Sequence, residues 1–376
     1  MKAGEAMSQW QTEMKNLITT AEEIKKKLEL SDEETERLDE VLKSYPMSIT
    51  PYYLSLADKT DPADPILKMC VPDYSEMTHI GSYDTSGEAD NTVSEGLQHK
   101  YRQTALVLTT NRCAMYCRHC FRRRLVGLTD DEIADGFGAE VEYIKAHPEI
   151  TNVILSGGDA LMLANARLRD YLRRLSALPQ LDLIRVATRM PVVLPMRIYE
   201  DGELLDILGE YSGIKRIYVV TQFNHPREIT PQSIKAIESL TKMGIVVKNQ
   251  TVLLKGVNDD PSVLGTLLRK LTAIGVVPYY IFQCRPVKGV KQQFQVPLIR
   301  GVQIVEDAKN MQNGQGKCLK YCMSHPRGKI EIVGQAPDGQ MIFKFHQAKY
   351  RQDDSRIFLL KLNGDHRWLT DELTGE

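Results

Sequence analysis

The chain has 376 residues, 42% of them hydrophobic, and a formal net charge of −1 at pH 7. A chain of this length can bury a large core, either as one barrel-like domain with additions or as two domains. The near-zero charge excludes a general electrostatic attraction to nucleic acid or to a membrane surface. No signal-peptide core opens the sequence and no apolar run is long enough to span a membrane, so we expect a cytoplasmic protein.

The first part of the chain, residues 1–97, is predicted to form helices followed by an extended arm. Residues 8–45 have the pattern of two helices with polar faces, and Ser31 with Glu34 forms a capping box at the start of the second. Residues 58–97 are rich in Asp, Pro, Gly, Ser and Thr, which predicts a long loop. A loop of this length is usually functional or packs across a neighbouring element.

From Thr104 onward, strand-like apolar runs alternate regularly with helical patterns. The strand-like runs are 105–108, 153–155, 183–187, 217–220, 246–254 and 277–282, and helices are predicted at 165–178, 230–243, 261–274 and 300–312. Such alternation implies parallel strands joined by right-handed crossovers. We therefore predict an α/β fold in which residues 98–312 form a partial (β/α)6 TIM-like barrel. A turn at 335–339 predicts a small β element within residues 313–376.

Polar residues follow each predicted barrel strand directly. They occupy positions 113–120, 156–159, 188–189, 222–225, 249–250 and 283–285. Active sites of such barrels lie at the carboxyl ends of the strands, so this placement fits a single site. The alternative is that polar residues merely begin the loops.

Three thiols, Cys113, Cys117 and Cys120, have C-x3-C-x2-C spacing in the loop after the first barrel strand. Thiolates are soft ligands that suit iron–sulfur clusters, zinc and copper(I). Iron–sulfur clusters usually take four cysteines, so three in one loop would leave one iron open to a small molecule. The alternative is a structural zinc site with His119 as fourth ligand, although zinc sites favour a second, distant Cys/His pair and none is evident.

The total of seven cysteines is odd, which argues for a reducing compartment and against a disulfide framework. The four cysteines outside the loop are Cys70, Cys284, Cys318 and Cys322. Cys318 and Cys322 are four residues apart and could indicate a second site, but we interpret them as buried free thiols.

The cysteine loop resembles the cluster-binding motif of radical S-adenosylmethionine (SAM) enzymes, and the chain as a whole resembles the lysine 2,3-aminomutase family. The shared stretches are 49–56, 113–120, 156–161, 191–195, 223–226, 249–250, 256–259 and 278–283. The resemblance implies a radical SAM barrel with a [4Fe–4S] cluster, SAM and pyridoxal 5′-phosphate (PLP) as cofactors. It also implies an isomerase that moves the amino group of a free L-amino acid from C2 to C3 through a PLP-bound substrate radical.

The resemblance assigns the three loop cysteines to the cluster and a further set of residues to SAM and PLP. Gly157 and Gly158 would let backbone approach the methionine part of SAM because glycine has no side chain, the alternative being an ordinary turn at a strand end. The other predicted cofactor-binding residues are Lys100, Tyr101, Asp159, Arg189, Gln222, Asn249, Gln250 and Lys329.

Lys329 is the residue that the resemblance assigns to covalent PLP binding. The segment before it is shorter than in the family, so Lys320 is the reserve assignment. Thr104 stands where relatives often carry an arginine that contacts the PLP phosphate. Arg102 or another basic residue is the candidate replacement.

The resemblance also assigns residues to the substrate. Arg122 matches the arginine that binds the α-carboxylate, whereas Arg123 and Arg124 are interpreted as a solvated basic patch. Lysine-specific members present two aspartates to the distal ammonium, and this chain has Arg285 and Ser324 at those positions. Glutamate 2,3-aminomutases carry a basic and a neutral residue there, so conversion of L-glutamate to β-glutamate is the expected reaction.

Other readings of the same residues remain open. The chain could resemble a lysine 2,3-aminomutase with another amino acid substrate, a radical SAM enzyme that modifies a protein or peptide, or a non-catalytic zinc- or cluster-binding protein. Arg285 could instead form a structural ion pair with an acid such as Glu306.

The partners expected from the resemblance are a small amino acid and an electron donor such as flavodoxin or ferredoxin. A homodimer or higher homo-oligomer is expected, with no nucleic acid or membrane partner. Residues 351–376 contain no cysteine, so we expect no zinc site like the one that many relatives carry there.

Overall fold

A twelve-stranded sheet organises the computed structural model, which describes residues 7–78, 80–133 and 136–376. The spatial order of the strands is the same as their order in the sequence. The strands are β1 Thr92–Ser94, β2 Leu97–Tyr101, β3 Thr104–Thr110, β4 Asn152–Gly157, β5 Leu183–Ala187, β6 Arg216–Thr221, β7 Val246–Leu253, β8 Val277–Gln283, β9 Lys320–His325, β10 Gly328–Gln335, β11 Met341–Ala348 and β12 Ile357–Leu360.

Strands β3 to β9 run parallel, whereas β1–β2 and β10–β12 extend the two edges with antiparallel pairs. Across the described residues β1 and β12 are not neighbours, so the sheet curves without closing. The six predicted barrel strands are confirmed as β3 to β8. The fold is therefore the expected partial TIM-like barrel.

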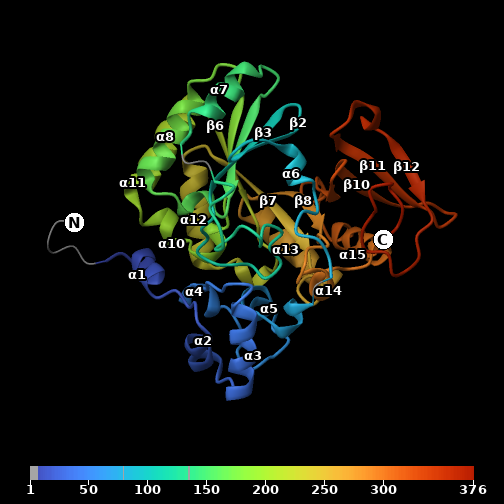
Figure 1. Cartoon of the computed structure of the whole chain (residues 1–376), viewed down its shortest axis with the longest axis horizontal. Coiled ribbons are helices and arrows are strands. Elements are labelled where there is room, and N and C mark those ends of the chain that lie inside the picture. Colours follow the sequence, from blue (N-terminus) through green and yellow to red (C-terminus); the bar gives the residue numbers. More distant parts are fainter. Residues whose placement is uncertain (1–6, 79, 134–135) are drawn as a thin grey trace.

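Helices cover the outside of the parallel strands, with α7, α8 and α11 along one side and the β10–β12 strands projecting on the opposite side (Figure 1). The helices are α1 Gln9–Lys15, α2 Ala21–Leu28, α3 Asp32–Leu42, α4 Pro51–Leu54, α5 Pro65–Cys70, α6 Glu88–Asn91, α7 Ala139–Ala146, α8 Asn165–Ser176, α9 Met190–Val193, α10 Met196–Tyr199, α11 Gly202–Ile214, α12 Pro231–Lys242, α13 Pro261–Ala273, α14 Lys291–Phe294 and α15 Leu298–Asn310. The four helices predicted in the barrel are confirmed as α8, α12, α13 and α15. In α8, Leu168, Leu172 and Leu175 are buried because their spacing places them on one face.

The N-terminal prediction of two helices is wrong, because three are present. Thr20 and Glu23 form a capping box that opens α2, in addition to the confirmed capping box of Ser31 at α3. The predicted long loop at 58–97 is also wrong. It contains α5, α6, β1 and the 3₁₀ helix η1 (Tyr74–Met77), and the start of α5 is fixed by the cap of Asp64 and by Pro65. Residues 1–6 and residue 79 of the predicted N-terminal part, 1–97, lie outside the described residues.

The predicted C-terminal β element is confirmed as β9–β12, and the predicted turn at 335–339 joins β10 to β11. In the β9–β10 pair, Ser324 lies directly opposite Lys329. The division of the chain into 1–97, 98–312 and 313–376 stays a prediction. Among the helices that the structure describes, none combines the length and apolarity needed to cross a bilayer.

Candidate active site

One cavity of about 380 Å³ collects nearly all of the predicted site residues. Its lining comes from the cysteine loop after β3, from the ends of the following strands, and from β9 and β10. This is the carboxyl-terminal end of the barrel, where the topology brings successive loops together. The predicted residues in the lining are Lys100, Tyr101, Cys113, Cys117, Cys120, Arg122, Gly157, Gly158, Asp159, Arg189, Gln222, Gln250, Arg285, Ser324 and Lys329.

Asn249 is the predicted residue that the structure leaves outside this lining. Its side-chain amide is buried and joins β7 to the end of β6, because Nδ2 donates to Phe223 O at 3.1 Å and Oδ1 accepts from Phe223 N at 2.7 Å. Asn249 therefore positions the backbone of the loop that follows β6.

The cysteine loop is bound tightly to the end of β4. Gly158 N donates to Thr110 O at 2.6 Å, and Asp159 N donates to Arg112 O at 2.8 Å. A Cβ atom on Gly157 would clash with the carbonyl oxygen of Thr110, and one on Gly158 would clash with that of Arg112. The two glycines are thus required for the close approach of these two loops. This packing role is separate from the predicted role of the glycines in SAM binding.

Two of the three thiols fit a ligand that supplies positive charge. Burial raises the pKa of Cys120 to about 11 and holds the pKa of Cys113 far above its usual value, so both thiols need a metal to ionise near neutral pH. Arg189 Nη1 donates to Cys117 Sγ at 2.9 Å.

His119, the fourth ligand of the zinc alternative, is turned toward a different group. Burial lowers the pKa of His119 to about 3, and its Nε2 accepts from Asn224 Nδ2 at 3.2 Å. In the described part of the chain, no three His, Cys, Asp or Glu side chains, the three loop cysteines included, are placed to hold a single metal ion. The buried Nδ1 of His119, a residue of the cavity lining, has no hydrogen-bond partner among the described residues.

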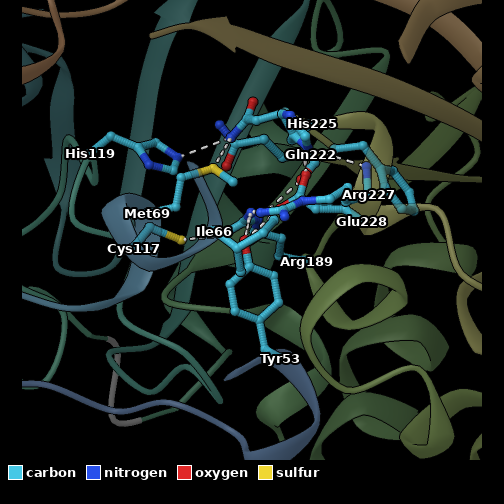
Figure 2. A network of polar contacts seen from close by, with 12 residues as sticks. Tyr53, Ile66, Met69, Cys117, His119, Arg189, Gln222, His225, Arg227 and Glu228 are labelled. Carbon is cyan, nitrogen blue, oxygen red and sulfur yellow. Dashed lines mark hydrogen bonds and ion pairs between the residues drawn. The ribbon is translucent and has the colours of Figure 1, made fainter. Parts of the chain in front are cut away.

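Arg189 joins the cysteine loop to a buried ion pair (Figure 2). Its Nη2 donates to Glu228 Oε1 at 2.5 Å, and its Nε donates to the backbone oxygen of Gln222 at 3.0 Å. Burial alone would lower the pKa of Arg189, but Cys117, Tyr53 and Glu228 outweigh it and raise the pKa. The guanidinium is therefore a fixed positive charge beside the thiols.

Asp159 holds two loops together. Its carboxylate accepts from Thr188 Oγ1 and from Arg189 N, both at 2.6 Å. Burial raises the pKa of this carboxyl group.

Lys329 lies on β10 at an aromatic wall of the cavity. Its ammonium stands 4.2 Å from the ring centroid of Tyr280 and donates to Gln347 Oε1 at 3.0 Å. Burial lowers the pKa of Lys329 to about 8, which makes the neutral, nucleophilic amine accessible near physiological pH. Lys320, the reserve residue, instead pairs with Glu331 at 2.6 Å and is not part of the lining.

Lys100 lies at the end of β2 and faces the same cavity. Its ammonium donates to the backbone oxygens of Ser86 at 2.9 Å and His325 at 2.6 Å. Burial lowers the pKa of Lys100 to about 7. These carbonyl contacts tie the α6 segment to the β9–β10 hairpin around the cavity.

The two predicted substrate arginines both lie close to one phenyl ring. The guanidinium carbon of Arg285 lies 3.9 Å from the ring centroid of Phe121, and that of Arg122 lies 4.7 Å from it. Arg285 Nη1 donates to Ser86 Oγ at 2.8 Å, whereas Arg122 Nε donates to Glu88 Oε1 at 3.0 Å. Burial lowers the pKa of Arg285 to about 10.

The proposed ion pair of Arg285 with Glu306 does not occur, because the carboxylate of Glu306 accepts from Lys309 at 2.7 Å.

The interpretation of Arg123 and Arg124 as a solvated patch is wrong. Arg123 is buried and pairs with Glu76, and Arg124 pairs with Glu88 and Glu132 at 2.7 Å each. Acids from the segment first interpreted as a loop provide most of these partners.

The prediction of buried thiols is wrong at Cys318, which is exposed.

Several cavity residues had no role in the sequence prediction. Glu88 in α6, Ser86 before it and Arg185 in β5 line the cavity. Arg185 had a visible signal, since a charged residue interrupts an otherwise apolar strand.

Comparisons with known proteins identify the class to which this site belongs. Residues 107–263 match the model of the Radical SAM superfamily, a segment that contains the cysteine loop and strands β4 to β7. The cluster and SAM follow from membership of this class.

Relatives along nearly the whole chain identify the family within that class. A putative L-lysine 2,3-aminomutase of Aquifex aeolicus is 38% identical over 93% of this chain and 94% of its own length. The L-lysine 2,3-aminomutase of Clostridium subterminale is 39% identical over 84% of this chain and 73% of its own length, and the glutamate 2,3-aminomutase of Clostridioides difficile is 36% identical over 85% and 74%. The chain belongs to the lysine 2,3-aminomutase family. Its members are isomerases, and membership supports PLP as the third cofactor.

Proposed function

We propose that this protein is a radical SAM 2,3-aminomutase that converts L-glutamate to β-glutamate. The observation that carries the proposal is that the guanidinium groups of Arg122 and Arg285 both lie against the ring of Phe121, in one cavity with Lys329. Two cationic anchors suit the two carboxylates of a short diacid. Each contact would be a charge-assisted hydrogen bond, for which Arg is well shaped.

The charges of the cavity lining favour an acidic substrate over lysine. Its cations include Lys100, Arg185 and Arg285, whereas Glu88 and Asp159 are the carboxylates of the described lining. Glu88 is already engaged by Arg122 and Arg124, and Asp159 by the loop contacts described above. The distal ammonium of lysine would therefore meet Arg285 without a carboxylate partner, which is unfavourable in a poorly solvated site. Lysine or another amino acid is the second candidate, because relatives of both names have similar identity to this chain.

Each cofactor has its own group of residues in the proposal. Cys113, Cys117 and Cys120 hold the cluster, and SAM binds between the cysteine loop and the ends of β4 to β7. Lys329 binds PLP, with Lys100 and Tyr101 beside it. When bound, the cluster and SAM supply hydrogen-atom abstraction from an unactivated carbon, and PLP supplies a carrier for the migrating nitrogen. We further propose that an external one-electron donor reduces the cluster and that the protein forms a homodimer.

Product analysis tests the substrate assignment. Purified protein, reconstituted anaerobically with iron, sulfide, SAM and PLP, is incubated separately with glutamate, lysine and aspartate under a chemical reductant. We expect the 3-amino isomer from glutamate at the highest kcat/KM. A higher kcat/KM with lysine would refute the proposal and would show that the cavity charges do not select the substrate.

A further inference from the structure

Two cationic side chains, Arg185 and Lys248, face the interior of the barrel, closer to the amino-terminal ends of the strands than the site residues described above. Along β5 the alternation of side chains puts Arg185 on the face of Ala187, and along β7 it puts Lys248 on the face of Gln250 and Val252. Ala187, Gln250 and Val252 all line the cavity, as does Arg185 itself. Arg185 and Lys248 therefore form the deeper, amino-terminal part of the same interior.

Both cations lack an acidic partner in the part of the chain that the structure describes. Within the described residues, no carboxylate forms an ion pair with Arg185, Lys248 or Lys329. Arg185 Nη2 donates to the neutral Oδ1 of Asn152, while its buried Nε has no hydrogen-bond partner. Lys248 has aromatic neighbours, with its ammonium 5.0 Å from the ring centroid of Tyr218 and 4.7 Å from that of Tyr279.

This arrangement is costly unless an anion balances it. Burial lowers the pKa of both Arg185 and Lys248, and the positive charge of Arg185 lowers the pKa of Lys248 further. Buried charges are normally paired, and an orphaned guanidinium N–H in a cavity wall is an exception that calls for a ligand. A phosphate dianion suits the vacant donor, because a guanidinium binds phosphate oxygens with fixed geometry.

The aromatic residues connect this pair of cations to Lys329. The rings of Tyr279 and Tyr280 have centroids 4.0 Å apart, with Lys248 over the first and Lys329 over the second. A flat ligand that reacts with an amine at one point and carries a phosphate at another would use both cationic positions.

We propose that Arg185 and Lys248 form the phosphate subsite for PLP, so that the phosphate lies in the barrel interior while the aldehyde carbon faces Lys329. This inference rests on the proposed use of Lys329 for PLP, but it does not depend on which amino acid is the substrate. The two residues act by binding the cofactor and take no part in moving the amino group.

Binding measurements without substrate test the subsite. The full-length, cluster-reconstituted protein is titrated with PLP and with pyridoxal, which lacks the phosphate, and bound cofactor is followed by absorbance. Arg185→Gln and Lys248→Gln should each weaken PLP binding roughly 10- to 100-fold, the loss expected for one charge-assisted hydrogen bond. Pyridoxal affinity should change by less than about threefold, which corresponds to less than about 0.7 kcal/mol. Inorganic phosphate should compete with PLP in the parent protein and compete less in the two variants.

Matched variants separate binding from folding. Arg269→Gln and Lys242→Gln remove exposed cations from α13 and α12 and should leave PLP affinity unchanged. Arg185→Lys and Lys248→Arg keep the charge and should retain more PLP affinity than the glutamine variants. Unchanged PLP affinity in both glutamine variants, or an equal loss for PLP and pyridoxal, would overturn the subsite. A protein that passes this test but is inactive on glutamate would refute the substrate assignment alone.

Discussion

Replacement of Arg285 by alanine is the most direct perturbation of substrate selection. The side chain lies against Phe121 in the cavity, and its Nη1 is held by the hydroxyl of Ser86 at 2.8 Å. The charge of Glu88 also acts on Arg285, but no carboxylate of the described residues forms an ion pair with it, so its positive charge is available to a carboxylate of the substrate. Arg285→Ala would therefore remove one charge-assisted contact to the distal carboxylate while leaving Arg122 to bind the α-carboxylate.

The expected size of the effect follows from one such contact. A hydrogen bond to a charged group contributes about 1.5–3 kcal/mol, so kcat/KM for glutamate should fall roughly 10- to 100-fold. Poor positioning could add to the loss, since an error of about 1 Å can cost on the order of a hundredfold in rate. Arg285→Asp should lose more with glutamate and could gain weak lysine activity, although Ser324 still supplies no second carboxylate.

The assay is kcat/KM for glutamate and for lysine in one anaerobic preparation of each protein. Arg269→Ala, an exposed arginine on α13, is the control for loss of a positive charge. Iron content and SAM cleavage without substrate should remain at the parent level in every variant. An Arg285→Ala protein indistinguishable from the parent on glutamate would refute the reasoning and would return Arg285 to a structural role beside Ser86.

Four further outcomes are expected. Cys117→Ser should lose iron and SAM cleavage together, measured by iron content and product analysis, because a hydroxyl is a poor soft-metal ligand. The rate of PLP capture should rise with pH around a midpoint near 8, because the pKa of Lys329 is lowered to about 8 and only the neutral amine reacts. In the same experiment, Lys329→Ala should give no borohydride-trapped adduct. Ser324→Asp should move that midpoint to higher pH. Glu228→Gln should lower the free energy of unfolding in urea by about 3–5 kcal/mol, because it leaves the charge of Arg189 buried and unpaired.

The barrel was predictable because its signals are local and repeated. Each strand of β3 to β8 is a short apolar run and each of the four predicted helices has a clear hydrophobic period, so tertiary contacts had little to override. The cysteine spacing and the polar residues at the strand ends are also local signals, so they predicted that the site lies at the carboxyl-terminal end of the barrel. The segment 58–97 was not predictable in this way, because its short helices are fixed by caps such as Asp64 and by buried ion pairs with distant arginines.

Arg185 and Lys248 had a signal in the sequence, a charged residue within an apolar strand, that the prediction did not use. Arg185 and Lys248 lie within runs interpreted as buried strands, where the apolar neighbours dominated the interpretation. In a closed or nearly closed barrel, one face of each strand points to the interior, which can hold a ligand instead of a packed core. A lone cation on that face is then a binding signal, whereas on a two-layer sheet it would be a surface residue.

The pairing of Ser324 with Lys329 links substrate charge to the reactivity of the lysine. The two residues are direct cross-strand partners in β9 and β10, and directly opposed side chains are close enough to interact. A carboxylate at position 324 would pair with the ammonium of Lys329, favour its charged form and raise its pKa, against the effect of burial. The neutral hydroxyl avoids this pairing, so the amine stays available near pH 8 and no carboxylate at that position repels an acidic substrate. In the proposed function, the same residue therefore favours both the covalent capture of PLP and the binding of a diacid.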